Sequence, residues 1–153
     1  MRTAKSCVVP AGGGVRHASP TPGRFFDLKL FREQTNDSVM LFEETLPPGT
    51  ASLYHLHHDS DEVAWVLEGE VTFKIGDEIA SGGPGTCALM PRNVAHAWKN
   101  TGATTARALF LYTPARAGGY IEEMAERGSP STAAERAEFC ERYGWEILGP
   151  NPL

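Results

Sequence analysis

Short runs of hydrophobic residues, many alternating with polar ones, follow one another from Phe25 to Thr113 and are separated by turn-forming residues. Alternation with a period of two is typical of strands, and many short runs bounded by turns indicate a β-sandwich or β-barrel. The breaks include Pro47-Pro48-Gly49 and the tight hairpin signal Gly76-Asp77. We therefore expect strands over 25–31, 38–46, 50–57, 61–67, 70–75, 78–81, 86–90, 94–99 and 104–113.

The two ends of the chain have a different pattern. Residues 1–24 are rich in Pro, Gly and small polar residues, which predicts an irregular N-terminal arm. Residues 117–127 and 132–142 are rich in Ala, Glu and Arg and predict two short helices, with Ser131 or Thr132 as the N-cap of the second. Residues 143–153 indicate a last short strand and a tail. The sequence thus predicts an arm (1–24), a β domain (25–113) and a helical appendage of that domain (114–153).

Composition narrows the class of protein. A chain of 153 residues has room for one domain with a proper core. The formal charge of -5 and the lack of a basic patch argue against a nucleic-acid partner. The apolar runs are too short to cross a membrane, and the N-terminus lacks the apolar segment of a secretory signal. Cys7, Cys87 and Cys140 are few and widely spaced, as expected of reduced thiols, so we expect a cytoplasmic protein.

Candidate chemistry is concentrated in three histidines and one glutamate. His55 and His57 share one face of an extended strand, and His58 takes the other face. Glu62 heads the next predicted strand, and His96 lies in a later one. Imidazole and carboxylate ligands suit a first-row transition metal, and a ligand set that leaves positions open is typical of a site that does chemistry. The sequence predicts a metal site, whereas His17 and His58 fit surface or structural roles.

The spacing of these residues resembles the two motifs of the cupin family. The pattern G-x5-H-x-H-x4-E-x6-G is met at every fixed position: Gly49, His55, His57, Glu62 and Gly69. The pattern G-x5-P-x-G-x2-H-x3-N is met at Gly85, Pro91, His96 and Asn100, with Asn93 where the family usually has glycine. Asparagine tolerates the positive φ angle that such a turn often needs.

The resemblance implies an all-β cupin jelly-roll barrel or sandwich with a short C-terminal helical appendage. The metal would be held inside it by His55, His57, Glu62 and His96. The closing Gly-Trp-Glu-Ile-Leu-Gly-Pro-x-Pro-Leu is similar to small single-domain bacterial cupins of the quercetin-dioxygenase-like type. One divalent transition metal ion per chain is expected, Fe(II) first, with Mn, Ni, Co, Cu or Zn as alternatives. No glycine fingerprint of an organic cofactor is present. Glu62 either ligates the metal or acts as a catalytic base.

Strand parity predicts which side chains line the cavity. Ala64 shares a face with Glu62, and its small size would leave room for a ligand. Leu53 stands two residues before His55, and Trp98 stands two residues after His96, although an ordinary core role fits Trp98 equally well. Phe110 and Tyr112 are further candidates, with the register of their strand left open.

Three functions are compatible with this pattern. The first is a dioxygenase that acts on a small enol, flavonoid-like or aromatic compound. The second is a metal-dependent isomerase, cyclase or lyase without a redox step, and the third is a non-catalytic cupin that binds a small molecule. Because a jelly roll leaves exposed strand edges, we also expect a homodimer in which residues before about 31 pair across the two subunits; a monomer with a folded-back arm is the alternative.

Overall fold

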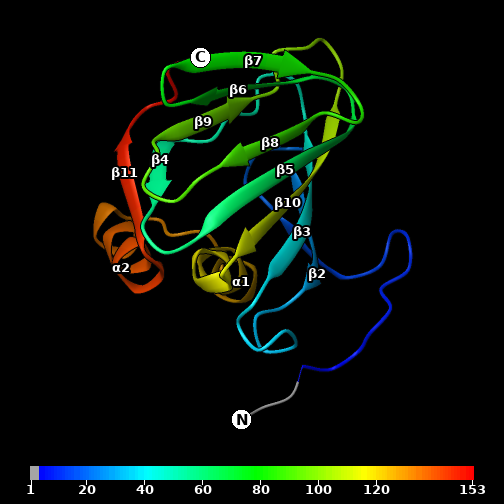
Figure 1. Cartoon of the computed structure of the whole chain (residues 1–153), viewed down its shortest axis with the longest axis vertical. Helices are drawn as coiled ribbons and strands as arrows, with labels where there is room; N and C mark the ends of the chain where they lie inside the picture. Colours follow the sequence, from blue (N-terminus) through cyan, green and yellow to red (C-terminus); the bar gives the residue numbers. More distant parts are fainter. Residues whose placement is uncertain (1–3) are drawn as a thin grey trace.

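Two antiparallel sheets face each other in the computed structural model, which describes residues 4–153 (Figure 1). The first sheet has six strands in the order β1 (Val15–Ala18), β2 (Phe25–Leu30), β3 (Met40–Leu46), β10 (Ala106–Thr113), β5 (Asp61–Glu68) and β8 (Cys87–Met90). The second has five, in the order β11 (Trp145–Gly149), β4 (Tyr54–His57), β9 (His96–Lys99), β6 (Val71–Ile75) and β7 (Glu78–Gly82). The described strands form a jelly-roll sandwich and not a closed barrel, which confirms the predicted fold class.

The core lies between the two sheets and follows the alternation of β3 and β10. In β10 every second residue from Ala106 to Tyr112 is buried, and β3 has the same pattern from Met40 to Leu46. Phe110 lies opposite Phe42 on one neighbouring strand and Ala64 on the other. Tyr112 lies in the same way between Met40 and Glu62. Each set of three residues forms a row of neighbouring side chains on the inner face of the first sheet.

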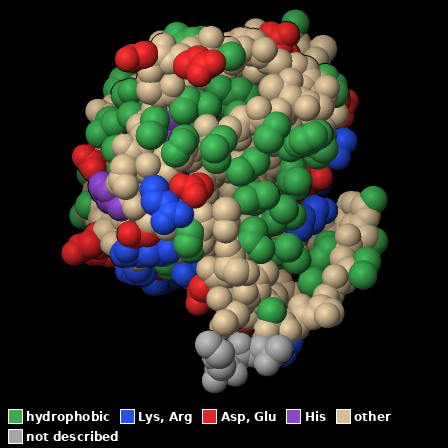
Figure 2. Space-filling view, viewed as in Figure 1, with side chains coloured by type: hydrophobic (Ala, Val, Ile, Leu, Met, Phe, Trp, Pro, Cys, Tyr) green, Lys and Arg blue, Asp and Glu red, His purple; other side chains and the backbone are tan. Residues whose placement is uncertain are grey.

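In β5 the more hydrophobic face is the outer one. Glu62, Ala64 and Val66 point into the sandwich and are buried, whereas Trp65 is 47% exposed and Leu67 is also exposed. Figure 2 shows hydrophobic side chains gathered over this side of the molecule, where β5 and β8 lie. Hydrophobicity alone would therefore have assigned the wrong face of β5 to the core.

The predicted strands from 25 to 113 are all present, most of them one to four residues shorter than predicted. The prediction of an irregular arm was wrong in part, because residues 15–18 form β1 and pair with β2 of the same chain. Backbone pairing at a sheet edge holds β1, and it buries too little apolar surface to leave a hydrophobic pattern. The first three residues of the predicted arm lie outside the described part. Pairing of this region with a second subunit stays a prediction.

The C-terminal segment covers one end of the sandwich (Figure 1). A short 3-10 helix (Ala115–Ala117) leads into α1 (Gly118–Arg127), and α2 (Ala133–Tyr143) follows. The Thr132 hydroxyl accepts a hydrogen bond from the Glu135 amide and caps α2, one of the two predicted caps. After Gly144, β11 pairs with β4, which places the end of the chain beside His55 and His57. None of the described helices has the length and apolar character needed to cross a membrane.

Candidate metal centre

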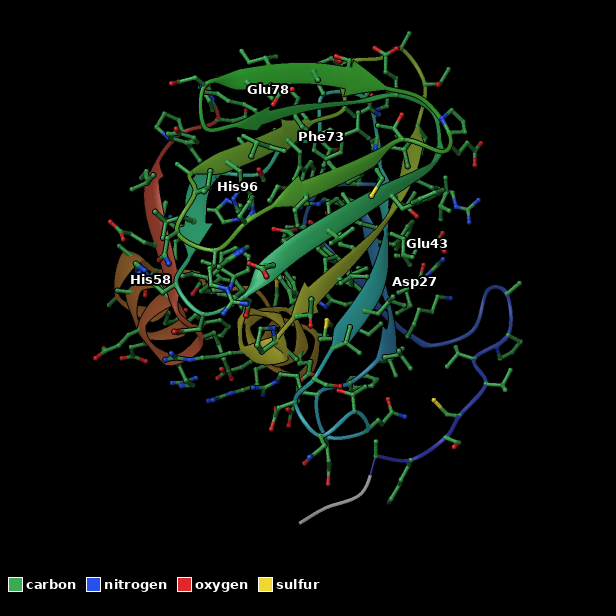
Figure 3. The ribbon with its side chains drawn as sticks, viewed as in Figure 1. Asp27, Glu43, His58, Phe73, Glu78 and His96 are labelled. Carbon is green, nitrogen blue, oxygen red and sulfur yellow. The ribbon has the colours of Figure 1, made fainter. Side chains whose placement is uncertain are left out.

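The four predicted ligands come from three strands and meet inside the sandwich. His55 and His57 lie on β4, His96 on the neighbouring β9 directly opposite His55, and Glu62 on β5 of the facing sheet. All four side chains are buried, and one potential ligand atom from each lies within 4.8 Å of the others. Figure 3 shows His96 between the sheets and His58 at the periphery. We call these four residues the histidine cluster.

Backbone carbonyls orient two of the imidazoles. His55 Nδ1 lies 2.7 Å from the Leu53 carbonyl oxygen, and His96 Nδ1 lies 3.0 Å from that of Val94. Because a carbonyl can only accept, each Nδ1 carries the proton and donates it. The Nε2 atom of His55 is then an acceptor with its lone pair free, which is the state that a metal requires.

Three ring nitrogens of the cluster have no hydrogen-bond partner among the described residues. His55 Nε2 and both ring nitrogens of His57 are buried without a hydrogen bond, whereas His96 Nε2 lies 3.0 Å from Glu62 Oε2. An unpaired buried polar group costs about 1–3 kcal/mol. A divalent metal would give these nitrogens a partner, so the donor set fits such an ion.

The electrostatics of the cluster also favour neutral imidazoles. Burial, and then the neighbouring His96, lower the pKa of His55 to about 3. Burial, and then the other histidines, hold the pKa of His57 well below its usual value. Burial opposes protonation of His96 too, but the hydrogen bond and negative charge of Glu62 outweigh it and raise the pKa of His96. Two of the three imidazoles are thus neutral at pH 7 without any metal.

Trp145 on β11 forms a wall of the cluster that sequence reasoning missed. Its ring stacks on that of His55 at 4.8 Å between centroids and meets the ring of His57 edge-on at 4.4 Å. Its Nε1–H donates to the Ala117 carbonyl over 2.9 Å, which fixes the ring. The only signal in the sequence is the closing Gly-Trp-Glu segment, which resembles the end of small cupins but does not indicate a role in the site.

A cavity of about 290 Å³ opens beside the cluster and is lined by His55 and Glu62. Four of the five residues expected to line it do so: Leu53, Trp98, Phe110 and Tyr112. Ala64 does not line it. Although Ala64 is buried on the same face as Glu62, Phe42 and Phe110 of its row provide the wall.

The cavity has a further set of lining residues that parity could not predict. Tyr120 on α1 and Arg136 on α2 close one side, so the helical appendage takes part in the site. Arg24 and Glu44 contribute an ion pair to the wall. Burial, and then the nearby Glu62 and Glu44 carboxylates, raise the pKa of Tyr112 well above its usual value, which places Tyr112 near both carboxylates.

Comparison with known proteins agrees with this geometry. The cupin domain family matches residues 42–112. A protein from Thermus thermophilus is 34% identical, with a TM-score of 0.50 over 52% of this chain and 75% of its own. A predicted oxalate decarboxylase from Thermotoga maritima is 21% identical, with a TM-score of 0.63 over 70% and 98% of the two chains. A sugar phosphate isomerase from a cupin superfamily, from Silicibacter pomeroyi, is 22% identical, with a TM-score of 0.57 over 70% and 75%.

The search among curated proteins gave no significant match. The cupin family match covers the stretch from β3 to β10 that contains all four residues of the histidine cluster. Together with the jelly-roll sandwich and the 34% identical structure, these observations show that the chain belongs to the cupin superfamily.

Proposed function

We propose that the chain is a metal-dependent enzyme that binds one divalent transition metal ion through His55, His57, Glu62 and His96. The observation that carries the proposal is the convergence of four buried side chains beside a cavity, with three of their ring nitrogens left without a hydrogen bond among the described residues. A structural histidine normally has its ring nitrogens satisfied by the protein. When bound, such a metal would lower the pKa of a substrate hydroxyl and, if it is iron, support chemistry with dioxygen.

The reaction that we propose first is that of a dioxygenase on a small enol, flavonoid-like or aromatic compound, with Fe(II) as the metal. The aromatic walls of the cavity, Trp98, Phe110 and Phe42, suit a flat apolar substrate. Glu62 faces the cavity, lies 3.0 Å from His96, and can hold the proton that a substrate hydroxyl releases. The Tyr112 hydroxyl lies near enough to donate a hydrogen bond to that carboxylate.

A second reaction class, an isomerisation or a decarboxylation without net oxidation, is supported by two structural neighbours. One is described as a sugar phosphate isomerase and the other as a predicted oxalate decarboxylase. Each is less than 25% identical to this chain, and their likeness concerns the fold. The same ligand set and the same proton-carrying Glu62 would serve this class.

Metal content tests the first part of the proposal. Elemental analysis of the purified protein should give one equivalent of a divalent transition metal, and His55→Ala should lose most of it. The matched control is His58→Ala, because His58 is an exposed neighbour in the same segment. A full equivalent of metal in the His55→Ala protein would contradict the assignment.

Oxygen consumption separates the two reaction classes. The Fe(II)-loaded protein is given a panel of catechols, flavonols and enols while dissolved oxygen and product are followed together. The dioxygenase proposal expects one molecule of dioxygen consumed for each molecule of substrate. Product without oxygen uptake would contradict it and favour the second class.

A further inference from the structure

An ion pair forms part of the cavity wall away from the histidine cluster. Glu44 on β3 is 1% exposed and points into the sandwich, and Arg24 directly precedes β2. Arg24 Nε donates to Glu44 Oε1 over 2.7 Å, and Arg24 Nη2 lies 2.6 Å from the same oxygen. The other carboxylate oxygen, Oε2, takes part in neither contact. Both residues line the cavity that His55 and Glu62 also line.

The fold gives little reason to keep a buried ion pair at this position. Removing two charges from water costs about as much as their attraction returns, and a hydrophobic pair of similar volume is often as stable. The guanidinium of Arg24 lies over aromatic rings, 5.0 Å from that of Phe26 and 5.8 Å from that of Trp98. These rings favour the cation of Arg24, but they do not offset the cost of burying the carboxylate of Glu44. A role toward a ligand in the cavity accounts for that carboxylate.

Strand register separates the backbone positions of the pair and the cluster along the cavity. Glu44 lies opposite Ala108, whereas Glu62 lies opposite Tyr112, four residues further along β10. At the rise of a β-strand, four residues correspond to roughly 13 Å of backbone. The row between them holds Phe42 and Phe110, whose rings stack at 5.4 Å. The cavity thus has polar groups at two separate positions and an aromatic wall between them.

We propose that Arg24 and Glu44 form a second anchoring point, which hydrogen-bonds a hydroxyl group at the far end of an elongated substrate bound at the histidine cluster. This inference rests on the proposed function, since the cluster must hold the other end. The carboxylate of Glu44 offsets the charge of Arg24, so the pair presents a donor and an acceptor side by side with little net charge. A hydroxyl group can donate to Glu44 and accept from Arg24. A carboxylate would meet the negative charge of Glu44, and a methyl group would form no hydrogen bond with either residue.

The substrate class follows from this arrangement. It is an aromatic or enol compound with an oxygen pair at one end and a neutral hydroxyl at the other, separated by about one ring and a short chain. Such a molecule would place its flat apolar part against Phe42 and Phe110. Specificity would then come from the pair, because a site built to hydrogen-bond a hydroxyl rejects an analogue that lacks it.

Three catechols with the same three-carbon side chain test the inference by calorimetry: 4-propylcatechol, 3-(3,4-dihydroxyphenyl)propan-1-ol and 3-(3,4-dihydroxyphenyl)propanoate. The protein is loaded with Zn(II), and the titrations are made under nitrogen so that the catechols are not oxidised. At pH 8 Glu44 is ionised, because burial, only partly offset by Arg24, raises its pKa to about 7. The terminal alcohol should bind about tenfold more tightly than 4-propylcatechol, as one hydrogen bond to a charged group provides. The carboxylate should bind no more tightly than 4-propylcatechol.

A paired variant assigns the preference to these two residues. The double substitution Arg24→Leu with Glu44→Leu should abolish the preference for the alcohol over 4-propylcatechol, because neither leucine can hydrogen-bond the hydroxyl. The matched control is Glu43→Leu with Arg107→Leu, which removes an ion pair from the outer face of the same sheet and should keep the preference. Figure 3 shows Glu43 on that outer side. The comparison of the three ligands needs no variant, so it stands even if the double substitution prevents folding.

The outcomes separate the two proposals. An alcohol that binds no better than 4-propylcatechol overturns the anchoring role while the metal site stands, and so does a preference that survives the double substitution. If the Zn(II)-loaded protein binds none of the three catechols, ligation of an oxygen pair at the cluster fails, and the anchoring role fails with it.

Discussion

The indole ring of Trp145 lies parallel to the imidazole of His55, with 4.8 Å between the ring centroids and 7° between the planes. This contact joins the last strand of the chain to the first residue of the histidine cluster. It exists because β11 returns past α2 to pair with β4, where Trp145 lies opposite His57. The C-terminal segment is therefore a wall of the candidate site and not merely an appendage.

Replacement of Trp145 should weaken metal binding. Trp145→Leu removes the ring that holds His55 and His57 in place, and loss of such supporting contacts typically lowers metal affinity by about 10- to 100-fold. Competition with a chromophoric chelator measures the change. Trp65→Leu is the matched control, since Trp65 is exposed on the outer face of β5. Equal affinity in both variants would contradict a role for Trp145 at the site.

Metal should stabilise the protein through Glu62. At 100 times its dissociation constant, a ligand that binds only the folded state adds about 2.7 kcal/mol, which corresponds to roughly 5–10 °C in Tm for a domain of this size. Glu62→Gln should lose most of this shift because the amide is a poorer ligand than the carboxylate. His58→Ala should keep it. Differential scanning fluorimetry with and without metal gives the comparison, and a full shift in Glu62→Gln would show that Glu62 contributes little to binding.

Glu44 should make stability depend on pH. In the unfolded chain its pKa is ordinary, near 4.5, whereas in the folded chain burial, partly offset by Arg24, raises it to about 7. The folded state therefore holds the proton more tightly, and the free energy of unfolding should fall as pH rises from about 4.5 to 7. Over this pH window the unmodified protein should lose about 3 kcal/mol of unfolding free energy relative to Glu44→Gln, at 1.36 kcal/mol per pKa unit. Urea denaturation at pH 5, 6, 7 and 8 measures it; a constant difference between the two proteins would refute the assignment.

Asn93 should tolerate glycine and resist alanine. Its φ angle of 64° lies in the left-handed region, as predicted from the motif, and its side-chain oxygen lies 3.2 Å from His58 Nδ1. Asn93→Ala should cost about 1–2 kcal/mol of unfolding free energy, while Asn93→Gly should be nearly neutral. Thermal denaturation of the two variants decides the matter. If alanine proved as stable as glycine, backbone conformation would not explain the residue found at this position.

The alternation of side chains along a strand predicted the inward face correctly where a motif residue showed which face points inward. Once His55, Glu62 and His96 are set inward, the faces of β4, β5 and β9 follow, and Leu53 and Trp98 reach the cavity as expected. The alternation predicts the face on which a side chain lies but not whether that side chain reaches the cavity. Ala64 therefore shares the buried face of Glu62 and does not line the cavity. The arm shows another limit, because β1 is held by backbone hydrogen bonds that leave little trace in side-chain pattern.

The sequence by itself determined the sandwich, its strands from Phe25 to Thr113 and the identity of the four cluster residues, because alternation and motif spacing are local properties of the chain. Only the tertiary structure decided what surrounds the cluster. Trp145 meets His55 because β11 pairs with the distant β4, and Arg24 meets Glu44 through the register of β2 with β3. No period in the sequence encodes which strands become neighbours or in which register. The ligands of the centre can therefore be recognised from local sequence motifs. The shape and polarity of the cavity depend on how the two sheets and the C-terminal segment pack together.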